Sequence, residues 1–414
     1  MDEQIIEDST DDSKRTRSFV IRITYLLLAI DVSCLFTLFA TFPYLVRKLG
    51  LDTVGFGYLQ TIFGILQLLG SPIFGRFSDR FGARAALTLS FLSGSLFYLL
   101  LSISTSVPLL FLSRIPSVFM HGLPGAQMVI TDLTTPTERG EALGKLGLCF
   151  GLGMIAGPFF GGILATKFGI YSPMYAALMG NLLGCVLTRA CIPSHIKPKS
   201  GSLSPANGTS KSNSVFNVNE IVRLMKFPDV RPIFTIKVIS VLPTGFFMVM
   251  FPVISINSFD QGAAEAGYVM SYFGVLQMVV QGVLVGWLTR HYTDGTLLLW
   301  SVMVASATGI AMALMTTVFH FCIIALPLVF ALATLGIITD SILTKAVPPS
   351  DTGAMLGICA SVQPLIRTVG PTIGGFLYQN YGLSAFGYLN FVVNLVLFCY
   401  ILKSNIPLKV KKER

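Results

Sequence analysis

The chain has 414 residues, of which 53% are hydrophobic and only 12% are charged, and its mean hydropathy is +0.73. Soluble globular domains carry about 25% charged residues, so this composition excludes an ordinary soluble enzyme and a disordered chain. The formal net charge of +9 is spread over the predicted loops and tails, so we expect no nucleic-acid partner. Long stretches without Asp, Glu, Lys or Arg predict an all-α protein embedded in the lipid bilayer.

Each long apolar stretch is interpreted as one membrane-crossing helix, because about 20 mostly apolar residues span the hydrocarbon core. The twelve expected helices are 19–46, 54–75, 84–104, 108–131, 144–166 and 171–192, then 231–257, 265–288, 296–316, 318–340, 355–377 and 384–403. An acidic tail, 1–17, precedes them and a basic tail, 404–414, follows. Lys and Arg gather in the tails and loops of one side, which predicts that both termini are cytosolic.

A linker rich in Ser, Gly, Pro and Lys, 193–230, divides the chain into a first six-helix bundle, 18–192, and a second, 231–403. Near its end, Val218, Ile221, Val222 and Met225 can share one helical face, which predicts a short interfacial helix. The sequon at Asn207 lies on the expected cytosolic side, so we expect no glycan there.

The two halves resemble each other, which predicts an internal repeat. Three patterns recur in the same order: Gly57-Tyr58 as Gly267-Tyr268, Ile130-Thr131-Asp132 as Ile338-Thr339-Asp340, and Gly157-Pro158 as Gly370-Pro371. Two parallel six-helix repeats around a central site are the layout of a secondary transporter.

The turn after the second expected helix carries glycines and alternating charges: Gly75, Asp79, Arg80, Gly82 and Arg84. This pattern resembles the cytosolic motif of the major facilitator superfamily. The resemblance implies twelve helices in two pseudo-repeats and a cytosolic gate that closes when Asp79 approaches a helix N-terminus of the other half. A second charge cluster, Asp132, Glu138 and Arg139, resembles another part of this gate. The alternative interpretation is an ordinary basic turn.

The fifth expected helix contains a set of small residues and one proline: Gly144, Gly153, Gly157, Pro158, Gly161 and Gly162. Their spacing resembles the motif of the superfamily's antiporter branch, although small residues also simply let two helices pack closely. Stretches such as 82–92, 126–133 and 360–375 narrow the resemblance to solute carrier family 22. This implies a monomeric transport unit that exchanges small organic cations for protons, in the plasma membrane (apical) or an endomembrane. We expect no cofactor, metal or catalytic residue.

Four ionisable residues fall inside expected helices: Asp31, Arg114, Lys237 and Arg367. An ionised side chain at mid-bilayer costs about 2.5–3.5 kcal/mol. Asp31 is the one acid that we place in the middle of a span, and a proton would cancel its charge, so we expect it to carry the coupled proton. Arg367 lies at a similar expected depth and is its expected ion-pair partner. The alternative is a permanent structural salt bridge. His121 is a second candidate proton relay.

The expected substrate cavity is lined by polar and aromatic residues of several helices: Phe39, Arg114, Ser117, His121, Lys237, Ser240, Thr244, Tyr268, Tyr272, Gln277, Gln363 and Arg367. Three bases and one acid fit an anion or a zwitterion better than a cation, whereas aromatic faces can hold a cation. The sequence leaves the sign of the substrate open. It also leaves open a membrane adaptor or organelle-contact protein that keeps the fold without transport.

Overall fold

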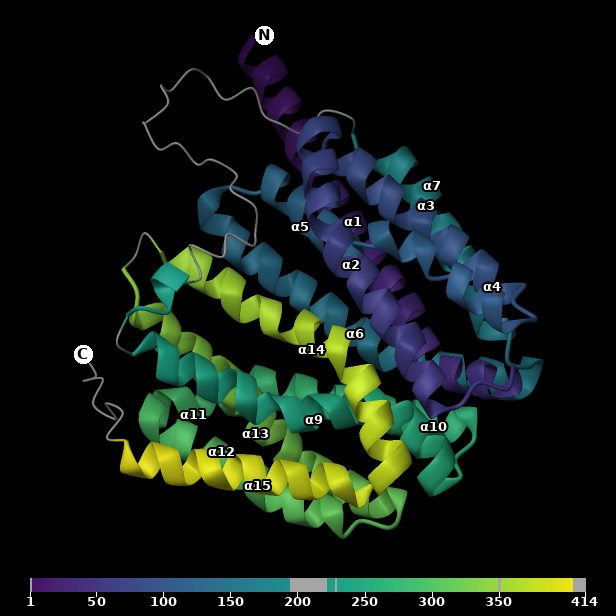
Figure 1. Ribbon diagram of the computed structural model, residues 1–414. Helices are drawn as coiled ribbons and strands as arrows, with labels where there is room; N and C mark the ends of the chain where they lie inside the picture. Colours follow the sequence, from purple (N-terminus) through teal and green to yellow (C-terminus); the bar gives the residue numbers. More distant parts are fainter. Residues whose placement is uncertain (1, 194–221, 228, 349–350, 405–414) are drawn as a thin grey trace. The chain divides into compact units, whose positions relative to one another are not determined.

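The computed structural model describes residues 2–193, 222–227, 229–348 and 351–404 (Figure 1). Within these ranges the chain is helical and contains no strand. It divides into two compact units, Met1–Leu45 with Leu66–Ser210 and Val46–Ile65 with Lys211–Arg414. The sequence predicts a division in the linker, whereas the structure also groups residues 46–65 with the second unit.

The first unit is built around a close pair of helices. Its elements are α1 (Asp2–Lys48), most of α2 (Thr53–Phe81), α3 (Ala83–Ser102), α4 (Val107–Leu112), the 3-10 helix η1 (Ile115–Phe119), α5 (Gly122–Leu133), α6 (Pro136–Phe168) and α7 (Ser172–Cys191). α3 and α7 lie side by side (Figure 1). At this contact the amide of Asn181 lies directly against Gly94, and the ring of Phe91 lies against Gly184. Glycine leaves the space that these larger side chains fill.

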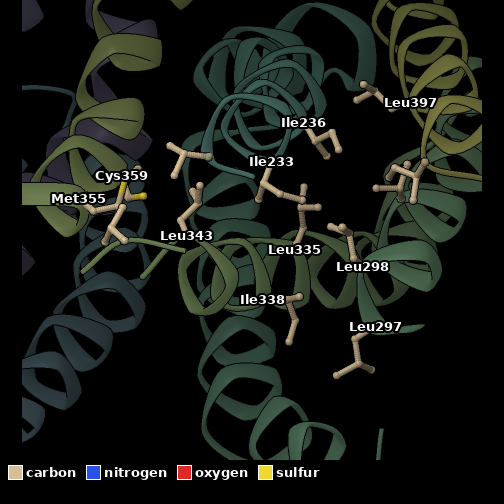
Figure 2. Close-up of a cluster of buried hydrophobic side chains, with 14 of the residues drawn as sticks. Ile233, Ile236, Leu297, Leu298, Leu335, Ile338, Leu343, Met355, Cys359 and Leu397 are labelled. Carbon is tan, nitrogen blue, oxygen red and sulfur yellow. The ribbon is translucent and has the colours of Figure 1, made fainter. Parts of the chain in front are cut away.

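The second unit contains the remaining long helices. They are α9 (Val230–Phe259), α10 (Ala263–Val279), the π-helical turn η2 (Val280–Leu284), α11 (Val285–His291), α12 (Asp294–Ala313), α13 (Val318–Lys345), α14 (Thr352–Tyr381) and α15 (Ser384–Lys403). α12 and α15 run side by side (Figure 1). They touch through their backbones, because a Cβ on Gly387 would lie 2.2 Å from the nitrogen of Ala313. One end of this unit is held by a buried apolar cluster that joins α9, α12, α13, α14 and α15 (Figure 2).

The first turns of α2 pack on α14 inside the second unit. A Cβ on Gly57 would lie 2.5 Å from the carbonyl oxygen of Pro371, and one on Gly64 would lie 2.8 Å from the Cα of Thr368. Between them the hydroxyls of Thr61 and Thr372 hydrogen-bond at 2.8 Å. This close, glycine-dependent contact explains why residues 46–65 group with the second unit.

Ten helices of the described chain are long and apolar enough to cross a membrane. The twelve expected helices are matched by helical segments, but two of those segments are not among the ten. One is α14, a continuous helix whose apolar residues alternate with polar residues and with two prolines, Pro364 and Pro371. The other is the expected helix 108–131, and there the prediction of a continuous helix is wrong.

Residues 107–133 form two helices and a 3-10 turn instead of one long helix. Pro116 lies in the first turn of η1 and lacks the N–H that a continuous helix would need. Side chains bind backbone carbonyls near this break: Gln67 Nε2 donates to Met120 at 3.0 Å, and His121 Nε2 lies 3.0 Å from the carbonyl oxygen of Val118. The break therefore has polar partners within the bundle.

The end of the linker folds onto the second unit. Leu224 is completely buried in its core and Met225 packs against the same cluster, whereas Val222 is exposed. Arg223 forms an ion pair with Asp351 at 2.7 Å. The predicted interfacial face is thus only partly matched, and Val218, Ile221, the sequon at Asn207 and the basic tail lie outside the described residues.

Candidate functional site

Asp31 lies at the break between η1 and α5. Its carboxylate rests against Gly122, the first residue of α5, so closely that a Cβ on Gly122 would lie 2.1 Å from Oδ2. The N-terminus of a helix attracts a carboxylate through its dipole and its free N–H groups. Asp31 is only partly exposed, and it forms no ion pair or hydrogen bond within the described part of the chain. The acid therefore keeps its capacity to bind a proton or a cation.

Arg114 lies at the junction of α4 and η1 and is completely buried. Its guanidinium carbon lies 4.1 Å from the ring centre of Phe42 and 5.1 Å from that of Phe97. None of its side-chain nitrogens hydrogen-bonds to another described residue. Attraction to two aromatic faces offsets part of the cost of burying this charge. A substrate cannot reach Arg114 in this conformation.

Three other expected cavity residues of the first unit lie near the same break or on α1. Ser117 and His121 are buried, and the ring of His121 contacts Phe74 at 5.1 Å between centres. Phe39 is half-buried and contacts Phe36. The break removes the single helical face that would have aligned Arg114, Ser117 and His121.

Lys237 is neutralised inside the second unit. Its Nζ lies 2.8 Å from Oδ1 of Asp340 on α13 and 3.3 Å from the hydroxyl of Thr339. The sequence interpretation placed Asp340 at the end of a helix and left Lys237 without a partner; α13 in fact continues to Lys345. The structure thus gives Lys237 an acidic partner: Lys237 and Asp340 form a partly buried ion pair between α9 and α13.

Ser240 and Thr244 belong to a hydrogen-bonded ladder between α9 and α15. Ser240 donates to the amide oxygen of Asn394, and Thr244 donates to that of Asn390 at 3.2 Å. Asn390 also donates to the carbonyl of Ala305 on α12 at 3.0 Å. All members are buried, so the two hydroxyls hold helices together in this structure, and a substrate would have to displace these contacts to bind them.

Gln363 and Arg367 stand one turn apart on α14, and both are exposed. Neither has a hydrogen bond or an ion pair with any described residue. On α10, Tyr272 is partly buried and donates to the carbonyl of Cys322 at 3.0 Å, Gln277 is partly exposed and Tyr268 is 45% exposed. The expected pairing of Arg367 with Asp31 joins residues of different units and stays a prediction.

The expected gate residues of the first unit bind the ends of neighbouring helices. Arg84 donates to the carbonyl of Arg189 at the end of α7, and Arg139 donates to that of Thr131 near the end of α5 at 3.3 Å. Positive side chains stabilise helix C-termini in this way. Gly82 begins α3 with a φ of 85°, a conformation that favours glycine. A Cβ on Gly75 would meet no neighbouring residue within 4 Å.

The remaining gate residues differ in their partners. Glu138 forms an ion pair with Arg17 of α1, and this hydrogen bond lowers the pKa of the Glu138 carboxyl below its usual range. Arg17 also donates to the carbonyl of Leu133. Asp79, Arg80 and Asp132 make no ion pair within the described chain, so the expected latch role of Asp79 stays a prediction.

The glycine motif of α6 forms a tight contact with α1. A Cβ on Gly157 would lie 2.5 Å from the carbonyl oxygen of Ser33, and Thr37 donates a hydrogen bond to the carbonyl of Gly157 at 2.9 Å. Gly153 and Gly161 face Val32 and Thr37 at similar distances, and Pro158 is buried beside them. Gly144 has open space around it, and Gly162 is buried. The motif therefore contains a close helix interface over part of its length.

The sequence analysis did not identify the polar residues that form hydrogen bonds and ion pairs with the expected cavity residues. Asp340, Asn390 and Asn394 hold the second unit together. In the first unit, Tyr98 is buried without a hydrogen bond to any described residue. A signal was present for the asparagines, because two polar residues at i and i+4 in an apolar helix share one face.

Helices long and apolar enough to span a membrane, glycine contacts between them and ionisable residues within them define a multi-pass membrane protein. The chain belongs to the Major Facilitator Superfamily, whose sequence model matches residues 23–339 and 233–414. It is 53% identical over 403 residues to solute carrier family 22 member 18 of Mus musculus, covering 96% of this chain and 99% of that protein. It is also 26% identical over 360 residues to the class B tetracycline resistance protein of Escherichia coli, covering 84% of each.

The fold is similar to that of solved transporters of this kind. A crystal structure of the peptide transporter POT in complex with sulfate matches with a TM-score of 0.72 at 16% identity, over 92% of this chain and 94% of that one. The protein is therefore a membrane transporter of the major facilitator type, and the proteins to which it is similar are transporters rather than enzymes.

Proposed function

We propose that this protein is a secondary active transporter that exchanges small organic ions for protons by alternating access. The observation that carries the proposal is Asp31, a carboxylate that lies within a candidate membrane span, at the break of a helix, without an ion pair among the described residues. Broken helices often form the sites of coupling ions in secondary transporters. A proton on Asp31 removes its charge and, with it, the cost of keeping an ion inside the membrane.

The first candidate substrate is an organic cation. A cation and a proton would compete for the carboxylate of Asp31, and such competition produces exchange without further machinery. An aromatic residue on the same helix, Phe39 on α1, would hold the cation through its ring face. The second candidate is an organic anion or a zwitterion, because the exposed guanidinium of Arg367 has no acidic partner within the described chain.

The proposed movement opens and closes helix contacts at the two sides of the membrane. The contact of α2 with α14 through Gly57, Gly64 and Thr61 is suited to this role, because it depends on backbone approach and one hydrogen bond. Asp79 is the proposed cytosolic latch. The proposal includes twelve crossings, both termini in the cytosol, a monomeric transport unit, and either the plasma membrane or an endomembrane as host.

The test is uptake by purified protein in liposomes under an imposed pH gradient. Suitable probes are benzyltrimethylammonium and benzenesulfonate, because each keeps its charge at every pH used and crosses lipid poorly. Gradient-driven uptake of either probe, above that of protein-free liposomes, supports the proposal. Uptake that does not depend on the pH gradient would exclude proton coupling. Absence of uptake for both probes, with correctly folded protein, would favour a membrane adaptor or organelle-contact protein.

A further inference from the structure

The strongest unexplained feature outside the proton site is the polar pair on α14. Residues four apart on a helix are neighbours on its surface, so the amide of Gln363 and the guanidinium of Arg367 can contact one ligand together. Both side chains are exposed and have no partner in the described part of the chain. α14 is otherwise a helix of low charge, and it contains no acid between Thr352 and Tyr381.

The internal repeat indicates that this pair is not needed for the fold. When Gly157-Pro158 of α6 is set against Gly370-Pro371 of α14, Arg367 falls opposite Met154 and Gln363 opposite Phe150. The first repeat thus builds the same kind of helix with two apolar residues. Because an ionised side chain within a membrane costs about 2.5–3.5 kcal/mol on insertion scales, an arginine that the fold does not require indicates a function.

The two other basic residues that we place in the interior of expected helices, Lys237 and Arg114, are already engaged. Lys237 is bound to Asp340 at 2.8 Å. Arg114 is completely buried between two aromatic rings, with its guanidinium carbon 4.1 Å from the centre of the nearer one. Arg367 differs from both, because it is exposed and no described acid neutralises it. It is therefore the basic residue of these three that a substrate can reach.

We propose that Gln363 and Arg367 bind the anionic group of the transported substrate, so that the substrate class is organic anions with a carboxylate, sulfonate or similar group. A guanidinium offers two parallel N–H donors to such a group, and the Gln363 amide adds a third donor. This inference rests on the proposed transport function and assigns the sign of its substrate. It selects the second of the two candidate substrates.

The test compares benzenesulfonate with benzyltrimethylammonium in liposomes that contain wild-type protein, Arg367→Gln, Arg367→Lys or Lys403→Gln. Lys403 is exposed at the end of α15, so Lys403→Gln removes the same charge away from α14. Wild type and Lys403→Gln are expected to take up benzenesulfonate, and Arg367→Gln at least tenfold less. Arg367→Lys keeps the charge but loses the paired donors, so we expect an intermediate rate. Thermal unfolding of each variant in detergent checks that it is folded.

The outcomes separate this inference from the proposed function. Uptake of benzyltrimethylammonium alone would overturn the inference and leave proton-coupled transport standing. Equal benzenesulfonate uptake by Arg367→Gln and wild type would also overturn it. If neither probe is taken up, the proposed function fails, and a binding measurement then tests the anion site. Saturable thermal stabilisation of the wild type by benzenesulfonate, abolished by Arg367→Gln, supports the site. If benzenesulfonate does not stabilise the wild type, the anion site is contradicted.

Discussion

Alanine at Gly157 is expected to force α1 and α6 apart. Its Cβ would lie 2.5 Å from the oxygen of Ser33 and 2.9 Å from the nitrogen of Thr37, and both are backbone atoms that cannot rotate away. Ordinary contacts begin near 3.4 Å, so the helices would have to separate by roughly 1 Å, a shift that overpacked cores tolerate poorly. The same movement would lengthen the hydrogen bond from Thr37 to the Gly157 carbonyl, now 2.9 Å.

The size of the effect follows from two opposing terms. Overpacking costs about 1–3 kcal/mol, and replacing glycine by alanine within a helix returns up to about 1 kcal/mol. Gly144→Ala on the same helix is the matched control, because no atom of another described helix lies within 4 Å of its Cβ position. Gly144→Ala should gain the helix stabilisation of alanine over glycine without any overpacking cost. We therefore expect the two variants to differ by about 2 kcal/mol, or roughly 4–8 °C in unfolding temperature for a unit of this size.

Thermal unfolding in detergent, followed by proton-exchange measurements in liposomes, provides the assay. Gly157→Ala should unfold at the lower temperature and exchange more slowly, and Gly157→Leu should be more affected still. Equal unfolding temperatures for Gly157→Ala and Gly144→Ala would refute the reasoning, because they would mean that α1 and α6 do not approach as closely as the structure indicates.

Two further predictions concern ion pairs. Asp340→Asn leaves Lys237 buried without an acid and should lower the free energy of unfolding by about 1–3 kcal/mol. We expect a smaller loss than for a fully buried pair, because the Asp340 side chain is 39% exposed. Asp294→Asn breaks a more exposed pair with Lys345, and an equal or larger effect of that substitution would contradict the prediction. Since Arg17 lowers the pKa of Glu138, the ionised carboxylate stabilises the fold above the ordinary glutamate pKa of about 4.3, and this contribution disappears as the pH falls through the lowered value. The gap in unfolding temperature between wild type and Glu138→Gln should therefore be present at pH 7 and vanish in acid, and a pH-independent gap would count against the ion pair.

The long apolar helices could be predicted from the sequence because their signal is composition over about 20 residues. The glycine contact of α6 was predictable as a close interface, although the sequence did not identify α1 as its partner. The break in the expected helix 108–131 was harder to foresee. Pro116 was visible, but a proline alone often only bends a helix, and the partners that satisfy the freed carbonyls, Gln67 and His121, come together only through folding.

The candidate site was predicted as a set of residue types rather than as contacts. Four mid-membrane charges could be identified, but their partners depend on which helices are neighbours. Lys237 meets Asp340 because α9 packs on α13, and sequence spacing carries no information on that packing. The hydroxyls of Ser240 and Thr244 likewise donate hydrogen bonds to asparagines of α15. Burial also separates Arg114 from Arg367, although both are isolated arginines in the sequence.

Proton flux in liposomes containing Asp31→Asn decides whether Asp31 carries the coupled proton. Asparagine keeps the shape that fits against Gly122 but cannot release or accept a proton, so the variant should fold. An anionic probe, which does not bind to the carboxylate of Asp31, should still bind to the variant. We expect that this variant does not move protons when a transported probe is added, and that a pH gradient no longer drives uptake of that probe. Substrate-coupled proton flux equal to that of wild type would show that Asp31 is structural and would contradict the mechanism.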